Sequence, residues 1–419
     1  MFVLSTLLLA LAPAQQPVWS LPPIEYGVRP SSDRVARLEA ALEAGERTLV
    51  SDGSMPTIEA LLTALEVPAS SQTTVFTRTS FQARLINPRH PRALYFSDDV
   101  YLGFVPGSKV VEIIAVDVKE GLVFYTFDRA AEVPHFQRET HRCLQCHAPA
   151  RKGGLPAHIL RSLHPAADGQ PLLRAGSRFV DHTTPYAERW GGWYVTGDVG
   201  EMEHLGNQVL AKGQERLAAA ASEHASLDGL CDVKPYAATT SDIVALLVLE
   251  HQTHAQNAIV WAGYEAQRAL FYQRALNEAL GEPEGTPVSS TETRLDSAAR
   301  KIVDALLFVD EPELTNAVGE GSVYAAEFQA RGLRDAQGRS LRDLDLKGRL
   351  FRYPLSYTID SEVFEGLPAP VRDRVWRRLW LILTDSLDDP DGPHLALADR
   401  TAIHEILTDT HGDSLPSYW

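Results

Sequence analysis

The pattern of hydrophobic positions changes its period along the chain. In the first third, short runs of β-branched and aromatic residues alternate with turn residues such as Asn87-Pro88 and Pro106-Gly107. Runs of this length between such turns are typical of strands in an antiparallel meander. The runs that we expect to form strands are 75–81, 93–96, 100–105, 110–116 and 122–127.

Two short helices are expected before the meander, and an irregular segment after it. Ser31 or Ser32 can cap the first helix, which extends to Ala44, and residues 57–65 predict the second. Residues 135–210 are rich in histidine, glycine and aromatic residues and show no regular period. We therefore expect this segment to be built mainly from loops.

From about Leu205 the hydrophobic period becomes that of helices. The strongest signal is 242–280, with Thr240 or Ser241 as its cap and Gly281 as its stop. A helix of this length indicates a bundle or a long buried support. Further helices are expected at 292–309, 322–332, 368–387 and 398–409.

Composition and charge narrow the class of protein. The chain has 419 residues, a net charge of −16 and three cysteines. This length predicts about two or three domains with an ample hydrophobic core. The acidic balance argues against nucleic acid and anionic membrane surfaces as partners. Three cysteines are too few for a disulfide scaffold, so the information lies in where each cysteine is placed.

An export signal is expected at the N-terminus. Residues 2–12 form an almost unbroken apolar run, and Ala12-Pro13-Ala14 matches a cleavage site, which predicts a signal peptide over 1–14. The run departs from the usual pattern because no Lys or Arg follows Met1, and the alternatives are a buried N-terminal helix or a mis-assigned start codon. It is shorter than the ~20 apolar residues of a membrane-spanning helix. We therefore expect a bacterial protein that is periplasmic or otherwise exported and does not span the membrane.

The segment Cys143-Leu144-Gln145-Cys146-His147 carries the clearest chemical signal. Its C-x-x-C-H spacing is the attachment signature of a c-type haem. The thiols of Cys143 and Cys146 reach two vinyl groups and form thioethers, and His147 supplies the proximal imidazole to the iron. The motif occurs once, so we expect one covalent haem c per chain.

Two other kinds of site use C-x-x-C and remain alternatives. A zinc site normally needs a second pair of ligands, whereas the remaining cysteine, Cys231, stands alone in the sequence. A redox-active dithiol normally belongs to a βαβ unit, whereas this motif follows a meander. Export favours haem, which is attached outside the cytoplasmic membrane. We expect Cys231 to be a buried free thiol, with a disulfide-linked dimer as the alternative.

The second axial position of the iron decides between electron transfer and small-molecule chemistry. Our candidate for this distal ligand is His204, followed by Met202, which lies two residues earlier. The alternatives are another histidine or an open position. Either candidate can also be an ordinary loop residue.

Candidates for binding the haem propionates are Arg142, Arg189 and Trp190. The Gly191-Gly192 pair after Trp190 allows a flat ligand to approach closely, with an ordinary aromatic hairpin as the alternative. His251 and His254 are three residues apart in the longest predicted helix and therefore share a face. They can line the haem pocket, bind a second metal or form a polar seam.

At Cys143 to His147 the chain resembles the c-type cytochromes. With residues 76–82, 190–194 and 353–357 it looks like a group of large exported monohaem proteins from environmental bacteria, which have no assigned activity. The resemblance covers most of the chain and implies haem attachment, with Cys143 and Cys146 as the attaching residues and His147 as the proximal ligand. Small cytochromes carry the motif near the N-terminus, whereas here it lies in mid-chain, so their all-helical fold is not implied.

These features predict an α+β fold with an antiparallel β-meander, a haem-binding segment and a larger, mostly α-helical region. The expected boundaries are a signal peptide over 1–14, an α+β region over 15–135, the haem-binding segment over 136–210 and the helical region over 211–419. The predicted function is electron transfer through one haem to or from a redox partner protein. The alternatives are a haem-dependent oxidoreductase with an open distal site for peroxide, a nitrogen oxide or an organic substrate, and a sensor or binding subunit.

Overall fold

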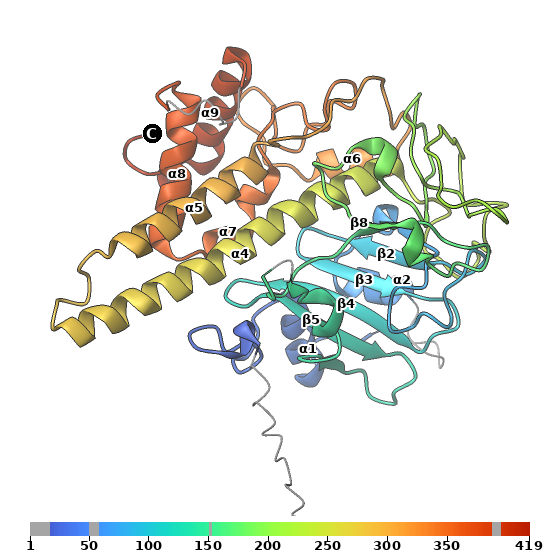
Figure 1. Ribbon diagram of the computed structural model, residues 1–419, viewed down its shortest axis with the longest axis horizontal. Coiled ribbons are helices and arrows are strands. Elements are labelled where there is room, and N and C mark those ends of the chain that lie inside the picture. Colours follow the sequence, from blue (N-terminus) through green and yellow to red (C-terminus); the bar gives the residue numbers. More distant parts are fainter. Residues whose placement is uncertain (1–16, 50–57, 151–152, 388–394) are drawn as a thin grey trace, which may run out of the picture.

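A seven-stranded antiparallel sheet forms the centre of the N-terminal half (Figure 1). The computed structural model describes residues 17–49, 58–150, 153–387 and 395–419, so the predicted signal peptide lies outside the described residues. The strands follow one another across the sheet in the order β6-β5-β4-β3-β2-β1-β9. Their bounds are β1 Thr73–Val75, β2 Arg92–Phe96, β3 Val100–Phe104, β4 Val110–Asp117, β5 Gly121–Asp128, β6 Phe136–Arg138 and β9 Trp193–Tyr194.

The predicted meander is confirmed for β2 to β5, which match the expected runs within a residue or two. The first run, 75–81, was placed too late, because β1 ends at Val75. Beyond it, Phe76 N–H donates to the Gly192 carbonyl and Arg78 N–H to the Gly169 carbonyl, so this backbone pairs with loops rather than with β2. The edge strand β9, which pairs with β1, was not expected.

One face of the sheet is covered by α1 (Arg34–Glu43) and α2 (Ile58–Ala64). Apolar side chains of both helices pack against alternate residues of the strands, such as Tyr95 and Ile113. The cap of α1 is Asp33 rather than Ser31 or Ser32, since its carboxylate accepts from the N–H groups of the first helical turn.

The opposite face is partly covered by α4 (Ile243–Leu280), the long helix expected from the sequence. Gly281 ends it in a left-handed conformation (φ 71°), as predicted. Its cap is Asp242 rather than Thr240 or Ser241, because the Asp242 carboxylate accepts from Val244 and Ala245.

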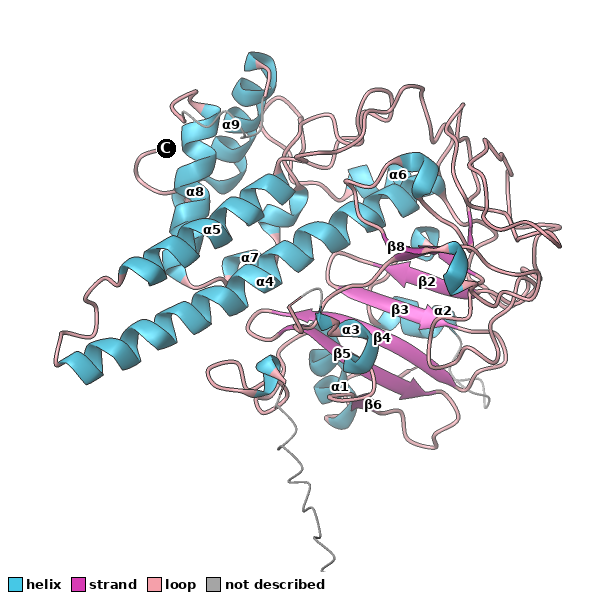
Figure 2. Cartoon of the chain, viewed as in Figure 1, coloured by secondary structure: helices cyan, strands magenta, loops and turns pink. Residues whose placement is uncertain are grey.

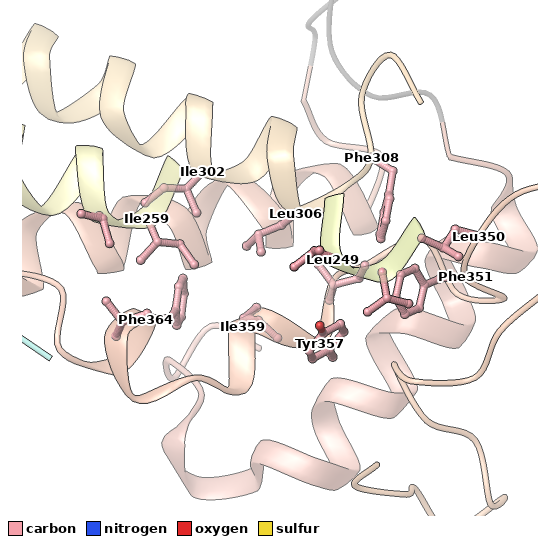
Figure 3. Packing of buried hydrophobic residues seen from close by; sticks show 14 of the residues in the cluster. Leu249, Ile259, Ile302, Leu306, Phe308, Leu350, Phe351, Tyr357, Ile359 and Phe364 are labelled. Atoms are coloured by element: carbon pink, nitrogen blue, oxygen red, sulfur yellow. The ribbon is translucent and has the colours of Figure 1, made fainter. Parts of the chain in front are cut away.

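Further helices pack beside α4 (Figure 1), and one of them, α7, also contacts β4. They are α5 (Ser289–Leu306), α6 (Val323–Ala330), α7 (Glu362–Glu365), α8 (Ala369–Leu383) and α9 (Leu397–His411). Figure 3 shows Ile259 of α4, Ile302 of α5 and Phe364 of α7 meeting in the largest hydrophobic cluster. Four of these helices lie close to the predicted ranges, so the mixed α+β fold with a mostly helical C-terminal region is confirmed.

The expectation that helix begins near Leu205 was wrong, because residues 205–240 contain no helix. The alanine-rich stretch near Ala220 is held extended instead. His204 and Ala220 exchange backbone hydrogen bonds of 3.1 Å, and Gly197 N–H donates to the His224 carbonyl. Tertiary pairing therefore overrides the helix propensity of alanine here. Within the described ranges, no helix has both the length and the apolar character needed to cross a membrane.

Candidate functional site

The C-x-x-C-H motif forms a single helical turn, α3 (Leu144–His147), preceded by Cys143. The N–H groups of Cys146 and His147 donate to the Cys143 carbonyl over 3.1 and 3.0 Å. Residues three and four positions apart share one face of a helix. The two thiols and the imidazole therefore project to the same side, as attachment of one haem requires.

The His147 ring is oriented by the chain ten residues further on. Its Nδ1 lies 3.0 Å from the Ala157 carbonyl oxygen, to which it donates, so Nε2 on the far side of the ring keeps its lone pair. The ring also packs against Phe124 of β5, with centroids 4.9 Å apart. Burial lowers the pKa of His147, which favours the neutral imidazole that binds metals.

The two motif thiols are free and differ in their exposure. Cys143 is half-buried and Cys146 is exposed. Burial, followed by the nearby carboxylates of Glu139 and Glu112, raises the pKa of Cys143 to about 12. A thiol-disulfide exchange enzyme needs a thiol with a lowered pKa. The electrostatic surroundings of Cys143 are therefore opposite to those of a reactive dithiol.

The sheet face beside α3 (Figure 2) is only partly covered and mixes apolar and charged side chains. Half-buried Ile114 lies opposite Phe124, the residue that contacts His147. Arg92 and Glu112 form an ion pair of 3.0 Å, and their strands flank Gly103, which has no side chain to separate them. The surface next to the imidazole is therefore mixed, and the fit to a haem rests on the two thiols and the imidazole of α3.

Arg142 is the propionate candidate that lies beside the motif. It is exposed, stands 5.5 Å above the Phe81 ring and 3.6 Å from the Glu139 carboxylate. Its guanidinium thus lies at the surface beside the motif with Phe81 and Glu139 as its partners, and a role in binding a propionate stays a prediction.

Arg189 and Trp190 are placed elsewhere. Arg189 is 2% exposed, and it donates to the Thr184 carbonyl (2.7 Å), the His182 carbonyl (2.8 Å) and the Glu250 carboxylate (2.7 Å). Trp190 is buried in the largest hydrophobic cluster. These side chains fasten the 182–190 loop to α4, and the structure does not bring either of them to the motif.

Gly191 also has a packing role. A Cβ atom at this position would lie 2.1 Å from the Leu163 carbonyl oxygen, so the glycine lets this loop pack against β7 (Arg161–Leu163). A Cβ atom at Gly192 would lie 2.2 Å from Thr77 Cγ2, so both glycines are approached by other parts of the protein, and the predicted approach of a flat ligand stays a prediction.

His204 and Met202 lie at the opposite edge of the sheet from the motif. Their turn is bonded to the β9 segment, since Asn207 N–H donates to the Trp193 carbonyl. His147 packs on β5, and β5 and β9 are five strand positions apart, which is about 24 Å at ~4.8 Å per position. The structure does not bring His204 and His147 together, so a distal role for His204 stays a prediction that this separation does not support.

Several buried polar side chains contact one another beside the long helix, and their spacing in the sequence did not predict these contacts. We call this group the α4 polar cluster, and it consists of His182, Arg189, Glu250, His251 and Ser356. The Nδ1 atoms of His182 and His251 are 3.0 Å apart, and His251 Nε2 lies 2.6 Å from the Ser356 hydroxyl. Burial lowers the pKa of His182 to about 3 and raises that of Glu250 to about 7.

The histidine pair of the long helix is divided between two environments. His251 is fully buried in the α4 polar cluster, and its ring stacks on Phe308 with centroids 4.0 Å apart. His254 is 27% exposed, and its Nδ1 lies 3.3 Å from the Asp181 carboxylate. The only sequence signal for this arrangement was the i, i+3 spacing, which does not name Asp181 or His182 as partners.

In the described part of the chain, no group of three or more His, Cys, Asp or Glu side chains is arranged to hold a metal ion. Comparisons with protein-family models, with curated proteins and with solved structures found no match for this chain.

Proposed function

We propose that this chain is an exported c-type cytochrome that carries one covalent haem and transfers electrons to or from a redox partner protein. Cys143 and Cys146 form the thioethers, and His147 is the proximal ligand. One observation carries the proposal, which is that the three residues share one face of a single helical turn while the Ala157 carbonyl orients the imidazole.

The hydrogen bond at Nδ1 supports the proposal because it leaves Nε2 available for the iron. Metal-binding histidines usually donate their second ring N–H to a carbonyl or carboxylate, which sets the tautomer and raises the basicity of the ligating nitrogen. A haem bound here supplies reversible one-electron chemistry. The chain contributes the two attachment points and the oriented imidazole.

The second candidate is a haem-dependent oxidoreductase with an open distal position. The observation that favours it is the separation of His204 and Met202 from the motif across the sheet. An iron without a second protein ligand can bind a small molecule such as peroxide or a nitrogen oxide. Coordination at the iron distinguishes the two candidates.

The test is an absorption spectrum of the chain produced in a periplasm with haem-attachment machinery. We expect a haem band that remains with the chain on a denaturing gel, is lost in the Cys143→Ala/Cys146→Ala double variant and is kept in the Cys231→Ala control. A chain without covalent haem would refute the proposal. A reduced spectrum that does not change with carbon monoxide indicates two axial ligands and electron transfer, whereas a changed spectrum indicates the open site.

A further inference from the structure

A cavity of about 510 Å³ lies between the segment that follows the motif and the two longest helices. Its walls come from residues 155–160, residues 179–183, α4, α5 and the loop after α5. Ligand pockets usually have volumes of roughly 300–1,000 Å³. The size is therefore that of a site for one small molecule.

A pair of titratable side chains faces this cavity. Asp181 and His254 both line it, with 24% and 27% of their side chains exposed and 3.3 Å between the carboxylate and Nδ1. Asp181 is itself held by Thr183, whose N–H and hydroxyl donate to its other oxygen over 3.1 and 2.7 Å. Although burial alone raises it, the pKa of Asp181 is lowered by His254 and Thr183, so the carboxylate is charged. Because Nδ1 of His254 is turned to this carboxylate, Nε2 is the ring nitrogen left for a ligand.

The remaining walls restrict the chemistry of a ligand. Most are apolar or aromatic, among them Ile159, Leu160, Val180 and Trp261. The described charged groups are the carboxylates of Asp181, Asp304 and Asp310 and the ammonium of Lys301, which stands 3.8 Å above the Trp261 ring. Asp304 is also paired with Arg300 over 3.8 Å, which leaves Asp181 and Asp310 against Lys301. This balance gives no excess of positive charge to attract an anion, and apolar walls favour a compact ring. The His254 acceptor calls for a hydroxyl or amine donor.

The cavity shares a wall with the motif. Ala157 lines the cavity, and its carbonyl oxygen accepts the hydrogen bond from His147 Nδ1. The next residue, His158, is pinned to α4, because its N–H donates to Asn257 Oδ1 (2.8 Å) and its carbonyl accepts from Asn257 Nδ2 (3.0 Å). Ala157 is thus the one residue between a ligand in this cavity and the imidazole of His147, and its neighbour His158 is held in place by α4.

We propose that this cavity binds a neutral ring compound of the phenol or hydroquinone class, whose hydroxyl group donates a hydrogen bond to His254 Nε2 and whose electrons leave toward His147. Such compounds release a proton and an electron together, which matches a base on one wall and the haem ligand behind another. The electron-transfer half of this inference rests on the proposed function, whereas the binding half does not.

The protons and electrons released in the oxidation each have an acceptor. Conversion of a hydroquinone to a quinone breaks two O–H bonds and releases two protons and two electrons. His254 takes each proton in turn and returns it to solvent through its exposed edge. The electrons go one at a time to the one-electron acceptor that the chain is proposed to carry, and from there to the redox partner protein.

The experiment is titration calorimetry on the full chain with hydroquinone and with its dimethyl ether, which has the same ring and no hydroxyl donor. We expect hydroquinone to bind roughly 2- to 10-fold more tightly, the difference expected from one hydrogen bond. His254→Ala should reduce the affinity for hydroquinone to that for the ether. Ala258→Phe, which fills the cavity from α4, should abolish binding of both. His404→Gln on α9, away from the cavity, is the matched control and should bind like the unchanged chain.

Equal affinities for the two compounds, or unchanged affinity in either cavity variant, would overturn the assignment of the ligand class. Loss of binding in the His404 control would show that the variants report on folding, and circular dichroism of each variant keeps that outcome separate. Reduction of the haem band is read in parallel. Binding without reduction refutes the electron route through Ala157 and leaves the site intact, whereas absence of covalent haem refutes the proposed function and leaves the binding measurement valid.

Discussion

The motif turn and the α4 polar cluster differ in how the chain holds them. Around α3, one thiol is exposed, the other is half-buried, and the imidazole has a single side-chain hydrogen bond, to Ala157. In the α4 polar cluster every side chain is buried, and the residues come from three separate parts of the chain, near 182–189, 250–251 and 356. The first region is accessible and lightly held, and the second is enclosed and held from several directions.

This difference reflects two physical requirements. Thiols that form bonds with a haem must be reachable before the bonds exist, so the attachment turn cannot be deeply buried. A buried arginine–glutamate pair is stable only while its charges and hydrogen bonds remain satisfied, so it must be enclosed by fixed partners. Substitutions in the α4 polar cluster should therefore change stability, and substitutions in the motif should change cofactor attachment.

The largest effect is expected for Arg189→Ala. The substitution leaves the Glu250 carboxylate buried without its partner and removes donors from the Thr184 and His182 carbonyls. We expect the free energy of unfolding to fall by about 3–5 kcal/mol, measured by urea denaturation.

Arg178→Ala is the matched control for this measurement. Arg178 pairs with Glu188, but both side chains are about half exposed, at 48% and 47%. Exposed pairs contribute about 0–1 kcal/mol. Similar losses for the two arginines would contradict the contrast between a buried and a solvent-screened ion pair.

A smaller, pH-dependent effect is expected from His182. Its folded pKa of about 3 lies below the ordinary value of 6.5, so between these values only the unfolded chain binds the proton. The stabilisation from the neutral ring is complete above pH 6.5 and is lost as the pH falls toward 3, at about 1.4 kcal/mol per pH unit. The His182→Asn variant should lack this contribution. Urea unfolding at pH 4, 5 and 6 measures this contribution. The same dependence of the free energy of unfolding on pH in the variant and the unchanged chain would refute it.

The smallest effect on stability is expected for Cys146→Ala. The side chain is exposed, and substitutions at such positions usually change the free energy of unfolding by less than about 0.5 kcal/mol. The same variant should retain at most the single thioether from Cys143, which mass spectrometry of the haem-bearing chain measures. A large loss of stability before haem attachment would show that α3 belongs to the core and would remove the contrast with the α4 polar cluster.

Much of the fold could be predicted because its signals are local. The strands β2 to β5 have alternating patterns with clear turns between them, and α4 has a cap, a long apolar pattern and a glycine stop. The predictions were wrong where a segment forms backbone hydrogen bonds with residues that are distant in the sequence. Residues 76–81 leave the sheet because their backbone meets Gly169 and Gly192, and Ala220 is extended because it pairs with His204.

In the candidate site, too, contacts within a short segment could be predicted, whereas contacts between distant segments could not. The C-x-x-C-H spacing lies within one helical turn, so the proximity of Cys143, Cys146 and His147 could be predicted, and their role in haem attachment stays a prediction. Distance from the motif suggested His204 as a haem contact, and its donor side chain suggested Arg189. The structure holds the first beyond β9 and the second against Glu250. No spacing rule could have paired Asp181 with His254, since a loop and a helix 73 positions apart meet there (254 − 181 = 73).

The sequence by itself determined strands β2 to β5, the long helix α4 and the C-x-x-C-H turn, because periodicity, capping and thiol spacing act over a few residues. Only the tertiary structure decided which side chains accompany the motif. Packing of α4 and the 153–163 segment against the sheet places Ala157 behind His147 and opens a cavity beside it. These contacts arise from burial of apolar surface between distant segments, which no local pattern encodes.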